Sequence, residues 1–462
     1  MPKTDKKLKS LKEAVSEKID TSFQIKVTKM PVKIIERFRQ KCKSITDTRA
    51  AWDIEYSLES IIIMVFIAVL GGCDTWVDIE QFCRTKKEWL KKFVELPNDS
   101  TPCNDTFSRV FHNIDQKEFH KLTVDFVTDN LSRIKRGLGI PNLNPVKHFA
   151  IDGKQERGTG RLAGTAEEIR DQQTLHIYET TEGVCVMSKR IDTKTNEIPV
   201  AQELLSAMES LEGVIVSGDA LHTQIPHTVI ITEKGGDYVF GLKGNQSALK
   251  NEVEFLFTEE KIKELKANPE TYFSVTEKSH SQIEIREYLM ITDTTLPSAE
   301  NRKWANLNSY MLVIKTCTNT TTGETVTEKR YYIGSLKDIE LFATIIRSHW
   351  GCEIHHFFLD YVYHQDFNQT VDENAFQNLA AVKKMTLTLI RIYSVLENLS
   401  VTLTRKRIGW DPETEIASIL SFYDEETLKN ALEASASAPA KPKRSRIKVK
   451  AYRAQLEAAN QN

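Results

Sequence analysis

Apolar and polar residues follow two different periods along this chain. In the first 140 residues, and again after residue 336, apolar positions recur every three or four residues or form continuous runs, which is typical of amphipathic and buried helices. The Gly71-Gly72 pair and the polar stretch 97–102, which holds two prolines, interrupt the runs. The pattern predicts an all-α N-terminal region and long C-terminal helices. The helices are expected at residues 32–42, 57–70, 75–93, 105–133, 339–363 and 374–396.

The pattern changes after Pro145, where short apolar or alternating runs indicate β-strands. Three strands, a helix, a strand, a second helix and a strand predict a mixed α/β layer like that of ribonuclease H. Between residues 247 and 335, a helix at 248–257 and a charged linker precede four alternating runs, which predict a separate, β-rich piece. The strands are expected at 148–152, 175–179, 184–191, 214–219, 237–242, 272–276, 282–291, 310–316 and 325–333, and the two helices of the first layer at 199–211 and 225–233.

Two apolar runs of this layer each end at an aspartate that lies next to a glycine. Asp152 precedes Gly153, and Asp219 follows Gly218. An acidic side chain at a strand end is held at the rim of a sheet, where active sites are commonly built. Glu353 follows far downstream on a predicted helix. Each residue alone is equally typical of a turn, a helix cap or a solvated face, but together they offer the oxygen ligands that Mg²⁺ prefers.

The helix that carries Glu353 has a polar and an apolar flank. At ~100° per residue, four polar side chains fall within an arc of roughly 60° and are expected to lie over an active site. A merely solvated polar face is the alternative. The polar set is His349, Glu353, His356 and Asp360, and the apolar flank expected to pack on the sheet is Trp350, Ile354, Phe357 and Phe358.

The histidines of this segment also allow a zinc site. His349 and His356 with Asp360 are ligand types that suit zinc or iron. No cysteine is recognised at a suitable spacing, however, and zinc would leave Asp152 and Asp219 unexplained. A carboxylate site is therefore favoured. The four histidines are His349, His355, His356 and His364.

Length and composition indicate the number of domains and the kind of protein. With 462 residues, of which 40% are hydrophobic and 27% charged, the chain is expected to form two or three soluble domains. Its seven cysteines include no Cys-x-x-Cys pair and are odd in number, which favours a reducing cytoplasm. The lysine-rich residues 1–18 lack the apolar centre of a secretory signal. The apolar run 61–70 is too short to cross a bilayer, which needs ~20 residues, and predicts a buried helix.

The net charge of −2 conceals two basic ends. Residues 1–50 carry +8 and residues 437–462 carry +6, which leaves −16 for the middle. Basic ends around an acidic, metal-binding middle suit an enzyme that acts on DNA. Two solvated tails are the alternative, and the Ala/Ser/Pro-rich residues 434–442 are typical of a linker into the second tail.

Seven stretches carry a resemblance to a known family. They are DTFSRVF at 105–111, IDGK at 151–154, NEI at 196–198, DAL at 219–221 with Gln224, GGDYV at 235–239 followed by Lys243 and Asn245-Gln246, EKRYYI at 328–333, and IRSHW at 346–350 with Glu353. In this order, over roughly residues 50–400, the chain resembles the DDE transposases of the ISAs-type, or H-repeat-associated, insertion-sequence group. It departs from their pattern within residues 280–286 and at Ile354.

The resemblance implies a ribonuclease-H-like catalytic domain interrupted by a β-rich insertion. It also implies that Asp152, Asp219 and Glu353 are the catalytic, metal-binding triad. The expected divisions are a basic N-terminal extension (1–49), a helical DNA-binding domain (50–140), the first part of the catalytic domain (145–246), the insertion (247–335), the second part with C-terminal helices (336–433) and a basic tail (434–462).

The mechanism that follows is a hypothesis. The triad would hold two Mg²⁺ or Mn²⁺ ions ~3.5–4 Å apart for in-line attack at phosphorus, first by water and then by the freed 3′-OH. The expected partner is double-stranded DNA, at terminal inverted repeats and at a target. A homodimer is expected to act on it in the bacterial cytoplasm, at the nucleoid. The candidate phosphate contacts are Lys154, Lys243, Arg286, Arg347 and His349.

Two other functions remain open. The first is a transposase-derived protein that binds DNA and no longer cuts it, and the departures near residue 284 and at Ile354 keep this alternative in view. The second is a stand-alone metal-dependent nuclease, which would hydrolyse DNA without joining ends. The complete acidic triad argues against the first, and the helical N-terminal region argues mildly against the second.

Overall fold

The structure is a computed structural model. It describes residues 8–19, 23, 32–141, 144, 146–161, 165, 170–192, 194–279, 281–292, 294–396 and 398–437. The first seven residues of the expected N-terminal extension and nearly all of the expected basic tail lie outside these ranges.

The N-terminal region is all-α, as predicted. Helix α3 is buried along its length, from Ile61 to Leu70, because its side chains are apolar on every face. The helix expected at 105–133 is two helices, because Asp115 begins a new one by accepting hydrogen bonds from the backbone N–H groups of Lys117 and Glu118, both at 2.9 Å. The helices are α1 Leu11–Lys18, α2 Val32–Cys42, α3 Leu58–Leu70, α4 Trp76–Thr85, α5 Lys87–Leu90, α6 Asn104–Asn113 and α7 Gln116–Gly137.

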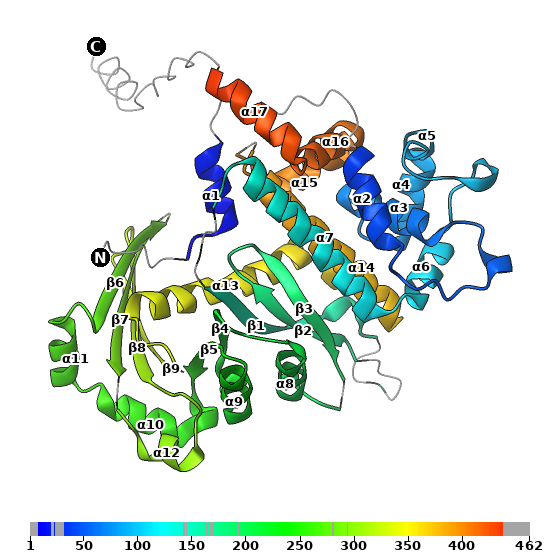
Figure 1. Cartoon of the computed structure of the whole chain (residues 1–462). Coiled ribbons are helices and arrows are strands. Elements are labelled where there is room, and N and C mark those ends of the chain that lie inside the picture. The colour runs from blue at the N-terminus through cyan, green and yellow to red at the C-terminus, as the bar shows by residue number, and fades with distance from the viewer. Residues whose placement is uncertain are drawn as a thin grey trace.

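The C-terminal helices complete the same helical body. Helix α14 runs between α3, α6 and α7, and a single hydrophobic core joins it to them (Figure 1). Residues far apart in the sequence therefore stabilise one layer above the sheet. The C-terminal helices are α13 Ile339–Tyr361, α14 Glu373–Tyr393, α15 Val401–Trp410, α16 Pro412–Phe422 and α17 Glu425–Ser437.

A nine-stranded mixed sheet forms the other half of the molecule, in the order β3-β2-β1-β4-β5-β9-β8-β7-β6. Strand β1 is antiparallel to β2 and parallel to β4, and β4 is parallel to β5. Helices α8 and α9 pack on one face, while α13 crosses the other (Figure 1). The first five strands are β1 Lys147–Glu156, β2 Gln172–Glu179, β3 Val184–Ile191, β4 Val214–Gly218 and β5 Asp237–Leu242, and the helices are α8 Glu197–Ala207 and α9 Ile225–Glu233.

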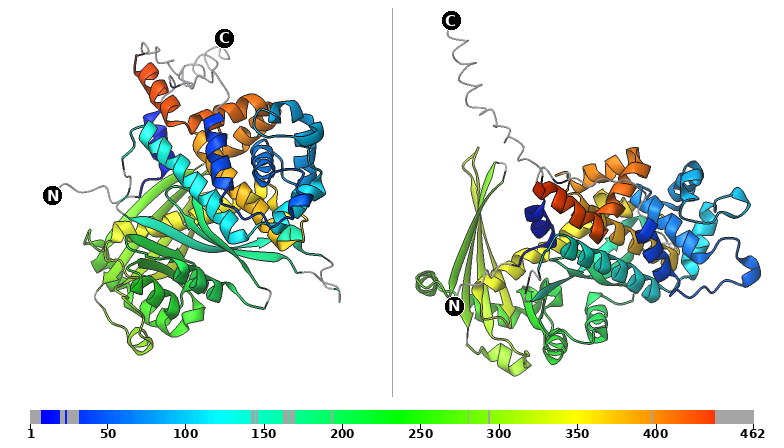
Figure 2. Two further views of the ribbon diagram at one scale, coloured as in Figure 1. Left: turned by 45° about the vertical axis from the view of Figure 1, so that its right-hand side comes forward. Right: turned by 45° about the horizontal axis from the view of Figure 1, so that its top comes forward.

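The β-rich segment is not a separate piece of sheet, contrary to expectation. Strand β9 pairs with β5, so β6 to β9 continue the central sheet and twist away from it (Figure 2). The charged linker contains a further helix, α11. These elements are α10 Ser247–Leu256, α11 Glu259–Lys266, β6 Tyr272–Ser279, β7 Gln282–Thr292, α12 Pro297–Arg302, β8 Ser309–Asn319 and β9 Thr325–Gly334.

Short 3₁₀ turns connect several of these elements. They are η1 Ala51–Asp53, η2 Pro97–Asp99, η3 Arg157–Thr159, η4 Ala220–His222, η5 Gly244–Gln246 and η6 Gln365–Phe367. Among the described residues, no helix is both long enough and apolar enough to span a membrane.

Candidate active site at the rim of the sheet

Asp152 lies where β1 loses one of its two neighbours. The pairing of β1 with β4 ends at Ile151, whereas its pairing with β2 continues to Glu156. The strand therefore does not stop at Gly153, contrary to the sequence prediction. The glycine leaves room for Glu197 at the start of α8, whose Oε1 would lie 2.2 Å from a Cβ atom at this position.

Asp219 follows β4 directly and caps η4. Its Oδ1 accepts a hydrogen bond of 2.9 Å from the backbone N–H of Leu221, which fixes the direction of the carboxylate, and the residue is exposed. Because β1 and β4 are parallel, Asp152 and Asp219 emerge at the same end of neighbouring strands.

Glu353 reaches this rim from α13. Burial raises the pKa of its carboxyl, and the negative charges of Asp152 and, more weakly, of Asp219 raise it further. The three acidic residues predicted from the sequence are thus brought within electrostatic reach of one another. They come from two strand ends and the helix that crosses them.

A hydrogen-bonded chain fastens α13 to the two parallel strands. Ser217 Oγ on β4 lies 2.7 Å from Nε2 of His148 on β1 and 2.8 Å from Nδ1 of His349 on α13. Burial lowers the pKa of both imidazoles, that of His148 to about 3, although Asp152 and Asp219 partly oppose the shift at His349. His349, one turn before Glu353, therefore points inward and helps to hold the helix in register.

The buried hydrogen bonds of His148, Ser217 and His349 predict that the stability of the protein is sensitive to acid. Below pH ~6.5 the unfolded chain protonates His148 while the folded chain does not, so stability should fall as the pH drops. We expect the free energy of unfolding to depend less steeply on pH in His148→Gln. Between pH 6 and 4 its slope should be smaller than that of the wild type by about 1.4 kcal/mol per pH unit. Urea unfolding at several pH values measures this slope.

Ser217→Ala is the matched control for the slope. It removes the bridging hydroxyl and should lower stability by about 1–3 kcal/mol at every pH, while leaving His148 free to titrate in the unfolded chain. An unchanged slope in His148→Gln would contradict the assignment of acid sensitivity to this imidazole.

A second polar chain leads to Asp152 from the interior. Nδ1 of His356 lies 3.4 Å from Oδ2 of Asp152, and its Nε2 lies 2.8 Å from Nδ1 of His176, the partner of Asp152 across the β1–β2 ladder. Nε2 of His176 is in turn 3.4 Å from the ammonium of Lys384, which also donates to Ser188 Oγ at 2.9 Å. One set of donors fits the two hydrogen bonds of His176: Lys384 donates to its Nε2, and its Nδ1–H donates to Nε2 of His356.

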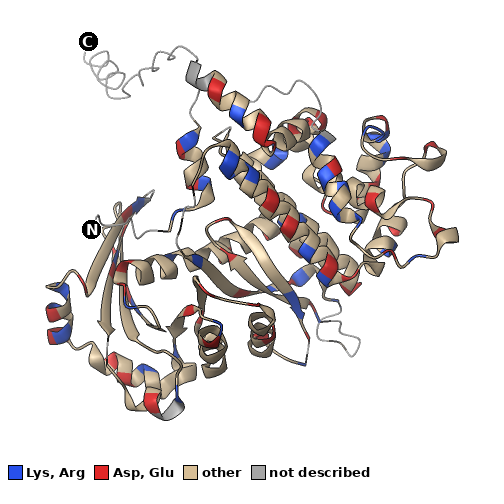
Figure 3. Ribbon diagram, in the orientation of Figure 1, with Lys and Arg blue, Asp and Glu red and all other residues tan. Residues whose placement is uncertain are grey.

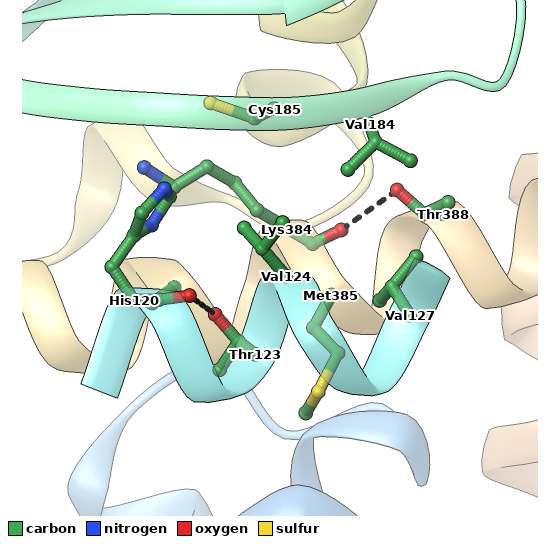
Figure 4. Close-up of a pocket in the computed structure, with 10 residues that line it drawn as sticks. His120, Thr123, Val124, Val127, Val184, Cys185, Lys384, Met385 and Thr388 are labelled. Carbon is green, nitrogen blue, oxygen red and sulfur yellow. Dashed lines mark hydrogen bonds between the residues drawn. The ribbon is translucent and has the colours of Figure 1, made fainter. Parts of the chain in front are cut away.

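Lys384 lies on α14, and its side chain reaches His176 through the layer between α7 and β3 (Figure 4). Its side chain lies there with His120, Val184 and Cys185. Burial lowers the pKa of Lys384, and it lowers that of His176 well below its usual value, with the Lys384 charge adding to the shift. The imidazole of His176 is therefore held neutral between Lys384 and His356.

Lys154 lies among carboxylates. Its ammonium is 2.5 Å from Asp360, 3.1 Å from Glu156 and 3.4 Å from Asp366, and the residue is only 4% exposed. Burial alone would lower the pKa of Lys154, but Glu156 and Asp360 outweigh it and the net shift is upward. The ammonium that the sequence offered as a phosphate contact instead ties the end of α13 and η6 to β1.

The apolar flank of α13 does not pack on the sheet, and this sequence prediction is wrong. Trp350, Ile354 and Phe357 are 40%, 48% and 55% exposed. The sheet takes the polar face instead, because Asp152, Lys154 and Ser217 on its strands pair with that face. The residues of α13 that are buried in this part of the helix are Cys352, His355, His356 and Leu359.

The exposed flank borders a groove of about 470 Å³ between α13 and strands β6 and β7. Arg286 and Arg347 line it, both hydrogen-bonded to Glu277, at 3.0 and 3.3 Å. The guanidinium of Arg330 lies over the ring of Trp350 at 5.9 Å. Lysines, arginines and acids are interspersed over the helices and over these strands (Figure 3), and the groove itself contains both signs.

Sequence reasoning missed several residues at this rim. Glu197 contacts the backbone of Gly153, His176 supports His356, and Cys352 Sγ lies 3.7 Å from Nε2 of His356. The last pair carried a signal, because residues four apart on a helix face the same way. The contacts of Glu197 and His176 depend on strand pairing and had no local signal.

Two family models match the chain. The model described as the transposase DDE domain matches residues 147–389, and the model described as DDE_Tnp_1-associated matches residues 39–127. The model of the transposase DDE domain covers more than half of the chain, including the mixed sheet and the acidic residues at its rim. Together these observations define the class of protein. The chain belongs to the family of transposases with a DDE domain, which confirms the resemblance found in the sequence.

Individual relatives have related names. The "H repeat-associated putative transposase YhhI" of Escherichia coli is 27% identical over 77% of this chain and 90% of its own length. The "Uncharacterized protein in dhlA 3'region" of Xanthobacter autotrophicus is 35% identical over 56% of this chain and 81% of its own length. The "Inactive transposase YbfQ" of Escherichia coli is 38% identical over 14% of this chain and 75% of its own length.

Among solved structures, the piggyBac transposase synaptic complex with hairpin DNA matches over 90% of this chain and 80% of its own. The sequence identity is 10% and the TM-score 0.36. That level of similarity is too low to add to the argument.

Proposed function

We propose that this protein is an insertion-sequence transposase that cuts DNA and transfers the cut strand to a target, with Asp152, Asp219 and Glu353 as its catalytic triad. The placement of Asp152 and Asp219 at the ends of two parallel strands, with Glu353 within electrostatic reach on α13, is the observation that supports this most. The order of the first five strands, with only the β2 connections antiparallel, supports a ribonuclease-H-like catalytic domain. We propose the bounds predicted from the sequence for the other parts of the chain: an N-terminal extension (1–49), a helical DNA-binding domain (50–140), an insertion (247–335) and a basic tail (434–462).

The donor set fits hard divalent cations. All three groups are carboxylates open to solvent in part, and Asp152 raises the pKa of Glu353, a repulsion that a bound cation would relieve. Two Mg²⁺ or Mn²⁺ ions would supply Lewis acidity at the attacking and leaving oxygens of a phosphodiester. The chain itself holds the carboxylates at fixed positions: His356 orients Asp152, the η4 backbone orients Asp219, and α13 carries Glu353.

The DNA is proposed to cross the rim and continue along α13. Arg286 and Arg347 line the groove beside Trp350 and Ile354, and Lys243 is exposed at the end of β5, so each can contact a phosphate. Lys154 is left out of this set, because its ammonium is buried among three carboxylates and closed off from solvent. We expect a homodimer, with each copy acting on one end of the element in the bacterial nucleoid.

The test uses the full chain and a labelled duplex that carries the inverted repeats flanking its gene. With Mg²⁺ or Mn²⁺, the account predicts strand cleavage at the repeat ends and, with a second duplex added, joined products. Binding without cleavage would instead support a transposase-derived DNA-binding protein, a possibility that the relative named as inactive keeps relevant. Cleavage without joined products would support a nuclease.

A further inference from the structure

A second set of metal donors overlaps the acidic rim. The ligand atoms of Asp152, Cys352 and His356 all lie within 4.8 Å of one another, and Cys352 Sγ is 3.7 Å from His356 Nε2. Asp152 comes from β1, while Cys352 and His356 come from successive turns of α13. The helix thus presents a thiol and an imidazole to the carboxylate that the proposed reaction uses.

We propose that Asp152, Cys352 and His356 form a binding site for a thiophilic divalent ion of the zinc class, which shares Asp152 with the acidic triad. Tetrahedral zinc, with bonds of ~2.0–2.3 Å, keeps its ligands roughly 3.3–3.8 Å apart. The Cys352–His356 pair already has this separation, and Asp152 needs to close by at most about 1 Å. The side chains of Asp152 and His356 are 28% and 11% exposed, so the site is open to solvent on the side of the carboxylate.

The ligand types of this site differ from those of the acidic triad. Sulfur and imidazole ligands favour zinc, cobalt and similar ions, whereas a set made only of carboxylates suits Mg²⁺. The thiol proton leaves to solvent as the metal binds, and the ring of His176, whose Nδ1 lies 2.8 Å from Nε2 of His356, must move to make room for the metal. Close by, His355 is fully buried, and neither of its ring nitrogens has a hydrogen-bond partner among the described residues.

One consequence rests on the proposed function. A zinc-class ion would compete with Mg²⁺ for the carboxylate of Asp152, so it should block DNA cleavage even when Mg²⁺ is in large excess. The binding itself does not depend on catalysis, and the two claims can fail separately.

Titration of the full-length protein with Co²⁺ tests the binding site. A thiolate-to-cobalt charge-transfer absorption should appear and saturate at about one ion per chain. It should persist in Cys103→Ser, which removes the exposed thiol, and be lost in Cys352→Ser. His356→Gln should weaken binding at least tenfold and serves as the second variant if Cys352→Ser does not fold, as judged by circular dichroism.

Absence of the band in the wild-type protein, or its survival in folded Cys352→Ser, would overturn the inference. These outcomes leave the proposed function untouched, because they are read without DNA. In the cleavage assay, one equivalent of Zn²⁺ should inhibit the wild type and spare Cys352→Ser. If no cleavage is seen in any protein while the cobalt band behaves as expected, the proposed function fails and the metal site stands.

Discussion

Asp152→Asn, Asp219→Asn and Glu353→Gln should each reduce strand cleavage on the order of 10³-fold or more. An amide of the same size cannot replace the charge of a carboxylate ligand, and the loss of several kcal/mol of charge stabilisation corresponds to that factor. Cleavage of the labelled duplex in Mg²⁺ measures the effect.

The same three variants should still fold and bind DNA. Their side chains remain isosteric, and the proposed phosphate contacts of Arg286 and Arg347 are untouched. Glu233→Gln, on the exposed end of α9, is the matched control and should cut at the wild-type rate. Full cleavage by any one of the three would remove that residue from the triad.

Lys154→Met should destabilise the protein by about 3–5 kcal/mol, the typical result of removing one partner from a buried charge cluster. The substitution preserves the volume of the side chain but removes the ammonium shared by Glu156, Asp360 and Asp366, and leaves Arg157, 4.0 Å from Asp366, as a nearby cation. A lower urea midpoint, with a matching loss of thermal stability, is the expected observation.

Lys189→Met is the matched control for this loss. Lys189 pairs with Glu203 between β3 and α8, and both side chains are well exposed. Such a pair contributes at most about 1 kcal/mol, so its removal should shift the midpoint little. Equal effects of the two substitutions would show that the charge cluster under α13 does not hold the helix to the sheet.

The sequence predicted local structure well where a local pattern decides it. Helices α2 and α9 and strand β5 have the predicted bounds. These elements are delimited by glycines, caps and apolar periodicity, which act over a few residues.

The predictions that failed depend on contacts between distant segments. Strand β1 continues past Gly153 because β2 still pairs with it, and periodicity cannot show that. The flank of α13 that includes Trp350 and Phe357 was expected to be buried because it is apolar. The strands below the helix carry polar partners, however, and they select the opposite face. Strands β6 to β9 alternate like an independent sheet, but the pairing of β9 with β5 joins them to the first.

The most direct test of the account is diffraction from crystals of the protein with a DNA end, soaked in Mn²⁺ and measured at the manganese absorption edge. The account predicts two anomalous peaks ~3.5–4 Å apart, coordinated by Asp152, Asp219 and Glu353. Peaks bound elsewhere, or none beside these carboxylates, would contradict it.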